Sequence, residues 1–383
     1  MILPFLLACA ALPPAPAPTP THSDWGHPGD QDLTALTAAY PSARGGRLDD
    51  CATCHCGGDD CAAPQPGAPA TNACDWCHGL QHPQEGRPHP GSFFDTLNPY
   101  GQAWLAAGRD AAAFTAIEAL DCDMDGAPNG AELASGHLPG DPASRPGQPT
   151  APLVRFTLPQ LRALPSTSAT LLANAPSAPE DAYATWEGVR LRDLLAAAGV
   201  DLADPGITGV TLVSPDGYRK EISRAQTLEE APAATFYAGL DVTALGERCG
   251  WVSYGPGPFP ADGAPQPPPA TQVAGARDGA PLPPVALDPS ISKLSGEGPL
   301  RAVVPQFTPG PPDRGSKHSP SGCDDGHDYD PQADHNAGGW VRGLVAVRVD
   351  PLPEGLEDLD WTRGGWGWIE RGELVVYGRG VGE

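Results

Sequence analysis

The sequence predicts an α+β protein in which a small, mainly helical or loop-rich segment precedes a larger mixed α/β segment. Three observations support this prediction. The 48 Pro and 47 Gly residues make up about a quarter of the 383 residues, which indicates long loops and short helices. Cysteine and histidine are concentrated in the first third of the chain. From residue 153 onward, apolar runs alternate with short amphipathic stretches, as strands and helices do.

Two proline-rich stretches, 12–21 and 137–152, divide the chain. Because linkers are rich in proline and few contacts cross them, we place the domain boundary near residue 149. The predicted units are a signal and tether over 1–21, a Cys- and His-rich domain over 22–148, and a mixed α/β domain over 149–383.

The first residues, MILPFLLACA, contain an apolar stretch of about eight residues, too short to span a bilayer. Leu6-Leu7-Ala8-Cys9 resembles a lipoprotein cleavage site, which would make Cys9 the lipidated residue and a membrane tether. The absence of Lys or Arg before this stretch also fits an ordinary signal peptide with a start codon assigned slightly upstream. Both interpretations predict export to the periplasm or the outer surface.

The net charge of −24, from 23 basic and 47 acidic residues, opposes binding to a phosphate backbone. We therefore expect protein partners rather than nucleic acid.

Two Cys-x-x-Cys-His sequences lie in the first domain, at 51–55 and 74–78. Covalent haem attachment needs two thiols that meet the two vinyl groups and an adjacent histidine that ligates the iron. The predicted thioether anchors are Cys51, Cys54, Cys74 and Cys77, and the predicted iron ligands are His55 and His78.

The same cysteines permit other interpretations. Nineteen residues separate Cys54 from Cys74, so Cys-x2-Cys-x19-Cys-x2-Cys also fits a zinc ribbon, and all four could form disulfides. Haem is favoured because a four-cysteine zinc site needs no histidine after each pair, and because c-type attachment is completed outside the cytoplasm. Cys56 and Cys61 are expected to form a local disulfide. We expect one or two haem c groups.

The first copy has a recognisable context. YPSARGGRLDDCATCH at 40–55 leads into LNPYGQAWLAAGRD at 97–110 and then into an acidic loop. This order resembles one family of bacterial c-type cytochrome domains. The resemblance implies a single haem site before the Asn-Pro-Tyr-Gly stretch, which places the second copy in an insertion. The available sixth iron ligands are His22, His27, His82, His89, His137 and Met124.

The acidic loop, DCDMDGAPNGAEL at 121–133, matches the calcium-binding pattern D-x-D-x-D-G-x5-E. Gly126 allows the sharp turn that this pattern requires. The segment after the loop is short, which predicts one structural calcium site rather than a paired sensor. The predicted ligands are Asp121, Asp123, Asp125, Asn129 and Glu132.

The second domain alternates predicted strands and helices. LVRF at 153–156 reads as a strand, and Thr157 is placed to cap the helix that follows. In 186–200, Leu191, Leu194 and Leu195 share one helical face. Two strands flank a Pro-Asp-Gly turn within 209–222. Further strands are predicted within 276–283, 296–306, 340–349 and 373–377.

Four short stretches, at 186–189, 216–218, 278–282 and 298–305, together resemble the sulfite oxidase-type molybdopterin-binding domain. In that family a cysteine thiolate ligates molybdenum between the first helix and the Trp-x-Gly-Val stretch, but no cysteine occurs in this interval here. The resemblance thus implies a molybdopterin cofactor that the residues do not support. We expect Cys249 and Cys323 to form a disulfide instead.

These patterns favour an exported protein that transfers electrons through covalent haem to redox partner proteins, with a cofactor-free sulfite oxidase-like domain. One alternative is a molybdopterin-dependent oxidoreductase whose second domain exchanges electrons with the haems. Another is a non-redox structural protein with a zinc module. No catalytic residue is assigned.

Overall fold

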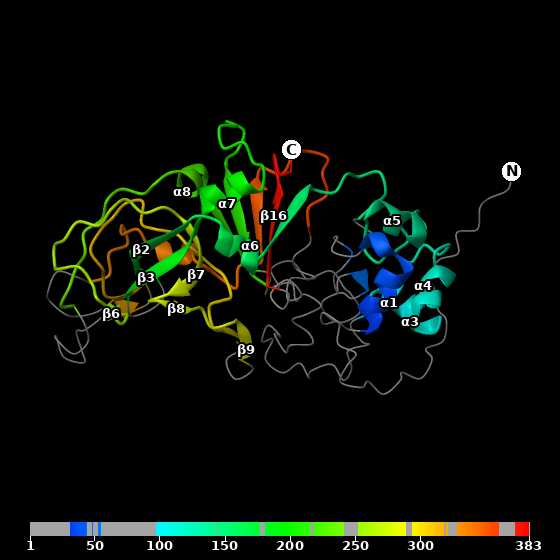
Figure 1. Cartoon of the computed structure of the whole chain (residues 1–383), viewed down its shortest axis with the longest axis horizontal. Coiled ribbons are helices and arrows are strands. Elements are labelled where there is room, and N and C mark those ends of the chain that lie inside the picture. Colours follow the sequence, from blue (N-terminus) through cyan, green and yellow to red (C-terminus); the bar gives the residue numbers. More distant parts are fainter. Residues whose placement is uncertain are drawn as a thin grey trace.

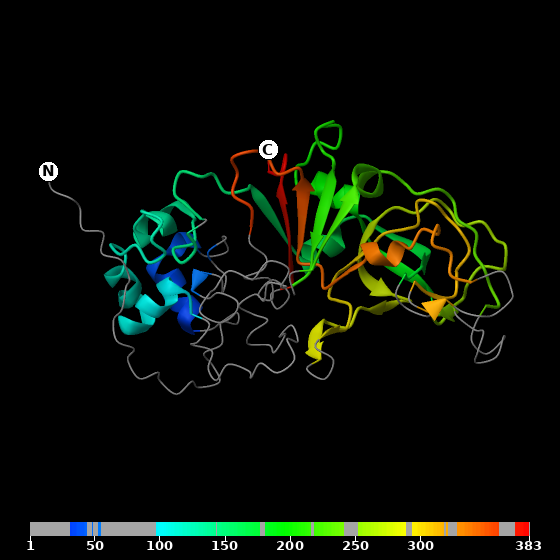
Figure 2. The same cartoon turned by 180° about the vertical axis from the view of Figure 1, so that it is seen from behind.

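A computed structural model describes most of the chain, and its two opposite views are given in Figures 1 and 2. Helices α1, α3, α4 and α5 gather at one end of the molecule, and the strands lie at the other together with α6, α7 and α8. None of the described helices is long and apolar enough to cross a membrane. The described residues are 31–43, 48, 53–54, 97–142, 144–176, 181–215, 218–240, 252–288, 293–317, 319–320, 328–359 and 372–382.

The helical end contains short helices whose starts are set by capping side chains. The Asn98 side chain accepts a hydrogen bond from the Gly101 N–H, and Asp110 accepts one from Ala113. The elements are α1 (Gln31–Ala39), η1 (Pro41–Ala43), α3 (Pro99–Ala106), α4 (Ala111–Ala116) and α5 (Asn129–Ser135).

An aromatic cluster holds these helices together. The rings of Trp104 and Phe114 stack with centroids 4.9 Å apart, and Tyr100 stacks on the same Phe114 ring at 6.0 Å. Tyr40 packs edge-on against Phe114, and its hydroxyl donates to a Glu118 carboxylate oxygen at 2.8 Å. Such rings bury large apolar areas, so this cluster is the main apolar core of the described helical residues.

A five-stranded sheet has the order β1-β16-β15-β4-β5. All of its neighbouring strands are antiparallel except β15 and β16, which are parallel. The strands are β1 (Leu153–Thr157), β4 (Gly209–Val213), β5 (Arg219–Ser223), β15 (Ala346–Asp350) and β16 (Glu373–Gly378), and the accompanying helices are α6 (Leu158–Ala163), α7 (Leu191–Ala197) and α8 (Arg224–Leu228).

A seven-stranded sheet has the order β14-β11-β7-β3-β2, with β6 paired to β3 and β8 to β7. Its strands are β2 (Ser166–Ala173), β3 (Asp181–Arg190), β6 (Val252–Tyr254), β7 (Gln272–Arg277), β8 (Ala280–Pro281), β11 (Arg301–Val303) and β14 (Val341–Arg342). Two small hairpins, β9–β10 (Ala286–Asp288, Lys293–Ser295) and β12–β13 (Gly315–Ser316, Ser319–Pro320), and the short helix η5 (Asn336–Gly339) complete the described elements.

The fold class predicted from the sequence, a mainly helical or loop-rich cytochrome c domain before a mixed α/β domain, is wrong. The protein is a mixed, sheet-rich fold built around sheets of five and seven strands. Its largest apolar cluster joins residues of both sheets, and the described helices at the other end have at most nine residues. Helices this short form through tertiary packing rather than propensity, so the sheets define the class.

Several individual elements are confirmed. Thr157 caps α6 through a full capping box with Gln160, and Leu191, Leu194 and Leu195 of α7 are completely buried. Each buried leucine contributes about 1.5–3 kcal/mol relative to an exposed one. The strand predicted within 276–283 is instead the end of β7, a two-residue turn and β8, because Asp278 and Gly279 have φ of 52° and 77°, the paired positive values of a hairpin turn.

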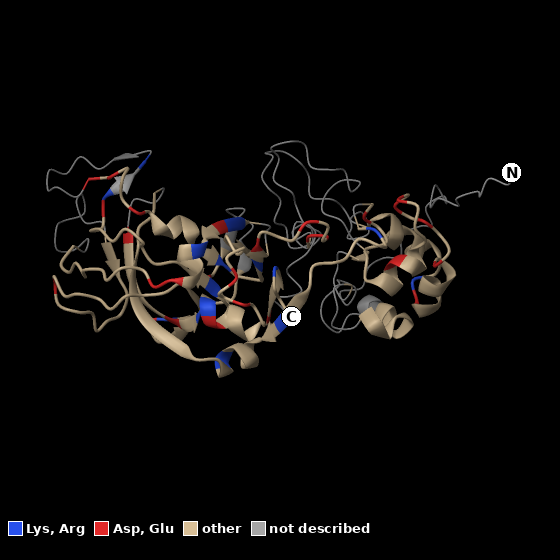
Figure 3. Cartoon of the chain, turned by 90° about the horizontal axis from the view of Figure 1, so that it is seen from above, with Lys and Arg blue, Asp and Glu red and all other residues tan. Residues whose placement is uncertain are grey.

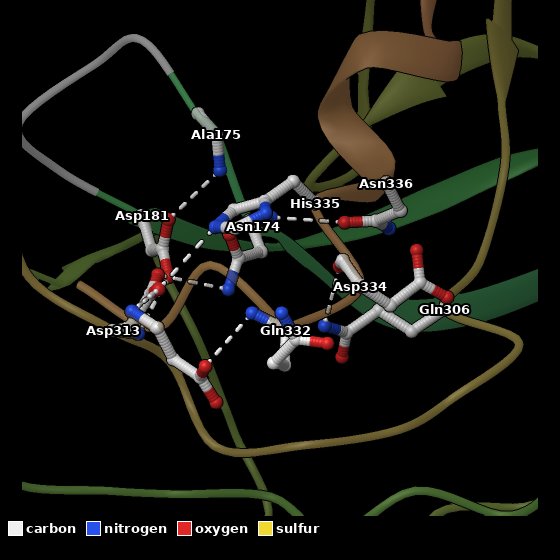
Figure 4. A network of polar contacts seen from close by, with 10 residues as sticks. Asn174, Ala175, Asp181, Gln306, Asp313, Gln332, Asp334, His335 and Asn336 are labelled. Atoms are coloured by element: carbon white, nitrogen blue, oxygen red, sulfur yellow. Dashed lines mark hydrogen bonds and ion pairs between the residues drawn. The ribbon is translucent and has the colours of Figure 1, made fainter. Parts of the chain in front are cut away.

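A buried polar network connects the end of β2, the start of β3 and two later loops (Figure 4). Asn174 donates to an Asp313 carboxylate oxygen at 3.0 Å, and its backbone N–H donates to Asn336 at 2.9 Å. The Asp181 carboxylate accepts from the Ala175 and Asp313 backbone N–H groups. Because the hydrogen bonds to Asp313 and Asn336 join segments more than 130 residues apart, the network fixes how these loops lie over the seven-stranded sheet.

Burial raises the pKa of Asp181 to about 7, against the effect of its two backbone hydrogen bonds. A raised carboxyl pKa contributes stability that is complete below the ordinary value near 4 and lost as the pH rises through about 7. The unfolding free energy of Asp181→Asn should therefore fall less steeply between pH 4 and 7 than that of wild type. Denaturant titrations across this range measure the slope, and Glu221→Gln, on the exposed side of β5, is the control. Equal slopes for Asp181→Asn and wild type would contradict the assignment.

The helical end is tied to the five-stranded sheet through the segment after α5. His137 is 3% exposed, and its ring nitrogens contact the Ser135 hydroxyl at 2.9 Å and the Gln148 carbonyl at 2.7 Å. Glu357 lies 3.6 Å from the same imidazole and exchanges backbone hydrogen bonds with 149–151. His137 is thus committed to this junction, which leaves it no ring nitrogen for the iron ligation considered from the sequence.

Candidate calcium site and the Cys-x-x-Cys-His anchor

The loop between α4 and α5 has the backbone that the calcium-binding pattern requires. Gly126 has φ of 101°, a conformation that side chains rarely adopt. Met124 also has a positive φ, 64°, and its side chain is 65% exposed, so it points away from the loop interior. Asn129 begins α5, which brings Glu132 back towards the loop after one helical turn.

The carboxylates of the loop divide their oxygens between the backbone and the loop centre. Asp121, Asp123 and Asp125 each accept one backbone N–H, at 3.1, 3.2 and 2.7 Å, with one oxygen. The other oxygen of each is buried and has no hydrogen-bond partner within the described residues. One ligand atom from each of the three residues lies within 4.8 Å of the others. The three aspartates thus present oxygens to one common point.

Glu132 completes this arrangement from α5. Its side chain is fully buried, and neither carboxylate oxygen has a hydrogen-bond partner in the described part of the chain. A buried carboxylate without a partner is strongly destabilising unless a cation or a proton compensates it. With the three aspartates, Glu132 provides five carboxylate oxygens, which suits the six to eight oxygen ligands of Ca²⁺.

The electrostatics of the loop also favour a cation. Burial, followed by repulsion from neighbouring carboxylates, raises the pKa of Asp123 to about 7 and that of Glu132 to about 9. Of residues 97–142, seven are acidic and one, Arg109, is basic (Figure 3). Arg145 lies 3.9 Å from Asp125, but its side chain is 60% exposed, so solvent screens this contact. A divalent cation at the loop centre would remove the repulsion.

Asn129, predicted as a ligand, has a structural task in this fold. Its Oδ1 accepts from the Cys122 backbone N–H at 3.1 Å, and its amide donates to the Ile117 carbonyl at 2.8 Å. The same amide lies 3.2 Å from the Cys122 sulfur. Asn129 therefore ties the two ends of the loop together, and direct ligation by this side chain stays a prediction.

Cys122 is a feature that the sequence interpretation missed. It is 1% exposed and disulfide-bonded, and its partner sulfur belongs to a cysteine outside the described residues. The signal was available in the sequence, because this cysteine stands between two aspartates of the loop, where a ligand pattern alone does not require it. The disulfide constrains the loop in addition to Asn129.

One part of the first Cys-x-x-Cys-His copy is described. The backbone carbonyl of Cys54 accepts from the Asn98 N–H at 3.0 Å, and the Asn98 side chain donates to the Thr53 carbonyl at 3.2 Å. Thr53 is fully buried, and its hydroxyl donates to the Leu48 carbonyl. This part of the motif is therefore fixed to the start of α3.

The other cysteines and histidines to which the sequence gave a role lie outside the described residues, and their geometry stays a prediction. They are Cys9, Cys51, His55, Cys56, Cys61, Cys74, Cys77, His78, Cys249 and Cys323, together with His22, His27, His82 and His89.

The interval in which the sulfite oxidase-type resemblance places a molybdenum thiolate does not fit that metal. Residues 164–186 contain no cysteine. The buried polar side chains there, Asn174 and Asp181, hydrogen-bond to other parts of the protein (Figure 4). Oxygen and amide ligands suit hard cations, whereas a dithiolene-bound metal needs a soft ligand. We derive no molybdenum chemistry from this region.

Comparison with models of known protein families and with curated protein sequences gives no match to this chain.

Proposed function

We propose that this chain is an exported electron-transfer protein in which a calcium-stabilised unit carries covalently attached haem. One observation above all supports the calcium site: Glu132 is fully buried with both carboxylate oxygens unpartnered within the described residues, and it is close enough to the three aspartates for their charges to raise its pKa. Helix α5 carries this carboxylate and loop 121–128 carries the others, so a bound cation would link two segments of the helical end.

The haem part rests on the two Cys-x-x-Cys-His sequences and on the fixed position of Thr53 and Cys54 against α3. In the attachment step, each thiol adds across one vinyl group: a C–S bond forms, the thiol hydrogen passes to the other vinyl carbon, and no net oxidation occurs. A haem held there would supply one-electron chemistry, so the chain would take an electron from a reduced partner protein and pass it to an oxidised one. The acidic surface favours partners with basic faces.

The partner of Cys122 in its disulfide decides how many cysteines remain for haem attachment. If its partner is Cys56 or Cys61, all four thioether anchors remain available for haem. If its partner is Cys51, Cys74 or Cys77, one motif loses a thiol. We expect the first pairing, which would replace the Cys56–Cys61 disulfide expected from the sequence, and peptide mapping under non-reducing conditions identifies it.

The proposal is tested on the full chain, exported by a host that attaches haem to Cys-x-x-Cys-His sequences. Haem staining should persist after denaturing electrophoresis, and the absorption bands should change reversibly between ferricyanide-oxidised and dithionite-reduced protein. Protein from the same host that is blocked in haem attachment is the control. Unstained protein containing stoichiometric zinc would instead support the structural zinc module.

A further inference from the structure

Strand β2 ends the order of the seven-stranded sheet, and one of its edges is open. All eight of its residues, Ser166–Ala173, pair with β3, and no described strand pairs with it on the other side (Figure 1). An open edge presents backbone N–H and C=O groups to which a further strand can hydrogen-bond. Strand β2 is therefore a position at which the sheet can be extended.

The side chain of Asn336 shows which backbone groups of β2 face this open edge. Its amide accepts from the Asn174 N–H and donates to the Leu172 carbonyl, both at 2.9 Å (Figure 4). These are the two bonds that a peptide group of a neighbouring strand would make. Asn336 therefore closes the edge at its C-terminal end, and the open part is residues 166–170.

The outward direction continues along β2 in steps of two residues. Thr170 lies opposite Thr185 of β3, whose backbone N–H and carbonyl hydrogen-bond to Asp278 on the far side of β3. Opposite residues of an antiparallel pair either bond to each other or both face away, so the backbone of Thr170 faces the open edge. Ser166 and Ser168 share this direction. No hydrogen bond reaches the backbone N–H or carbonyl of these three residues within the described part of the chain.

The open part differs chemically from the other ends of the two large sheets. Ser166 and Ser168 are exposed, and β2 contains neither a charged residue nor a proline. Charged side chains on an edge strand discourage pairing with another chain. The strands at the other three ends of the two sheet orders carry such side chains: Arg155 in β1, Arg219, Lys220 and Glu221 in β5, and Arg342 in β14. Of these four described ends, β2 alone lacks this protection.

We propose that residues 166–170 pair antiparallel with the same residues of a second copy of this chain, so that two seven-stranded sheets join. Because Asn336 closes the edge beyond Thr170, the open part has its midpoint at Ser168. The two-fold axis then passes beside Ser168, which lies opposite Ser168 of the second copy, and Ser166 lies opposite Thr170. In this register all three outward-facing residues of each copy exchange backbone hydrogen bonds.

A second copy is the occupant that the composition of this edge fits. A net charge of −24 makes the charged surfaces of two copies repel each other, whereas β2 brings no charge into the contact. The facing side chains, Ser opposite Ser and Ser opposite Thr, can hydrogen-bond across the strands. Five residues a side compare with about 20–30 in a stable interface, so the dimer is weak and reversible. Neither calcium nor haem takes part in this pairing, which goes beyond the proposed function.

Sedimentation equilibrium of the full chain, at protein concentrations rising to the millimolar range, tests the pairing. Wild type should form dimers reversibly as the concentration rises. Ser168→Lys should raise the dimer dissociation constant by about fivefold, because two like charges then face each other at the axis. Ala196→Lys, at an exposed position of α7, adds the same charge away from β2 and is the matched control. Its dissociation constant should equal that of wild type.

A mixture of two variants tests the register. Ser168→Glu alone should also weaken the dimer, whereas an equimolar mixture of Ser168→Lys and Ser168→Glu should associate at least as tightly as wild type, because opposite charges meet at the axis. Thermal unfolding checks that each variant folds, and if one does not, the other is compared with wild type by itself. A wild type that stays monomeric throughout, or a folded Ser168 variant that dimerises as wild type does, would overturn the proposal. So would a mixture that dimerises no better than its two components.

Discussion

Calcium added to metal-stripped protein should raise its melting temperature by several degrees, and Glu132→Gln should abolish most of this gain. A ligand that binds only the folded state at a free concentration 100 times its Kd stabilises it by about 2.7 kcal/mol. Glutamine keeps the size of Glu132 but removes its charge and one of its two carboxylate oxygens, so bidentate coordination is lost. Calorimetric scans with excess Ca²⁺ and with EDTA measure the effect.

The stability of the metal-free protein provides a second test of the calcium site. Burial beside three aspartates raises the pKa of Glu132 to about 9, so in the metal-free protein it takes up a proton at neutral pH, which lowers the stability of the folded state. Glu132→Gln should therefore be at least as stable as wild type in EDTA at neutral pH, while being clearly less stable in Ca²⁺. Glu187→Gln, on an exposed position of β3, should behave as wild type in both conditions. Equal calcium-induced shifts in wild type and Glu132→Gln would exclude the loop as the binding site.

Paired serine substitutions should remove haem one motif at a time. Serine cannot form the thioether, so Cys51→Ser/Cys54→Ser and Cys74→Ser/Cys77→Ser should each lose one haem from the intact mass of a chain that carries two. The mass reports attachment directly and does not depend on the stability of the variant. Cys249→Ser/Cys323→Ser is the control, since it changes two thiols outside both motifs.

The outcome also distinguishes one haem from two. If only the first motif attaches haem, Cys74→Ser/Cys77→Ser keeps the mass of one haem. Cys51→Ser/Cys54→Ser then loses that mass entirely. Loss of haem in the control pair alone would contradict the assignment of both motifs.

Local features were predictable from the sequence because short-range interactions determine them. Thr157 caps α6, and the loop from Asp121 to Glu132 has the turn and the carboxylates that its pattern predicts. Leu191, Leu194 and Leu195 of α7 are buried, as their helical spacing predicts. In each case, the residues that decide the geometry lie within a few positions of one another.

The fold class was not predictable in the same way, because it depends on pairings between distant segments. Leu153 of β1 lies opposite Tyr377 of β16, and the polar network joins Asn174 to Asn336. No local pattern encodes such contacts. The resemblance to a haem-bearing family favoured a helical first domain, whereas the long sheets define the molecule as a whole.

The candidate site was predicted in composition but only partly in geometry. The sequence pattern predicted that the acidic residues gather in one loop, yet it placed Asn129 among the ligands without the hydrogen bonds that tie it to Ile117 and Cys122.

The central claim is that one chain carries both covalent haem iron and a bound calcium ion. Elemental analysis of the full chain, purified without chelators from a haem-attaching host that exports it, tests both parts in one measurement. We expect calcium at one ion per chain and iron at one or two, with zinc and molybdenum below stoichiometric levels. Stoichiometric zinc with no iron would contradict the haem assignment, stoichiometric molybdenum would contradict a cofactor-free sheet-rich part, and the absence of calcium would contradict the loop site.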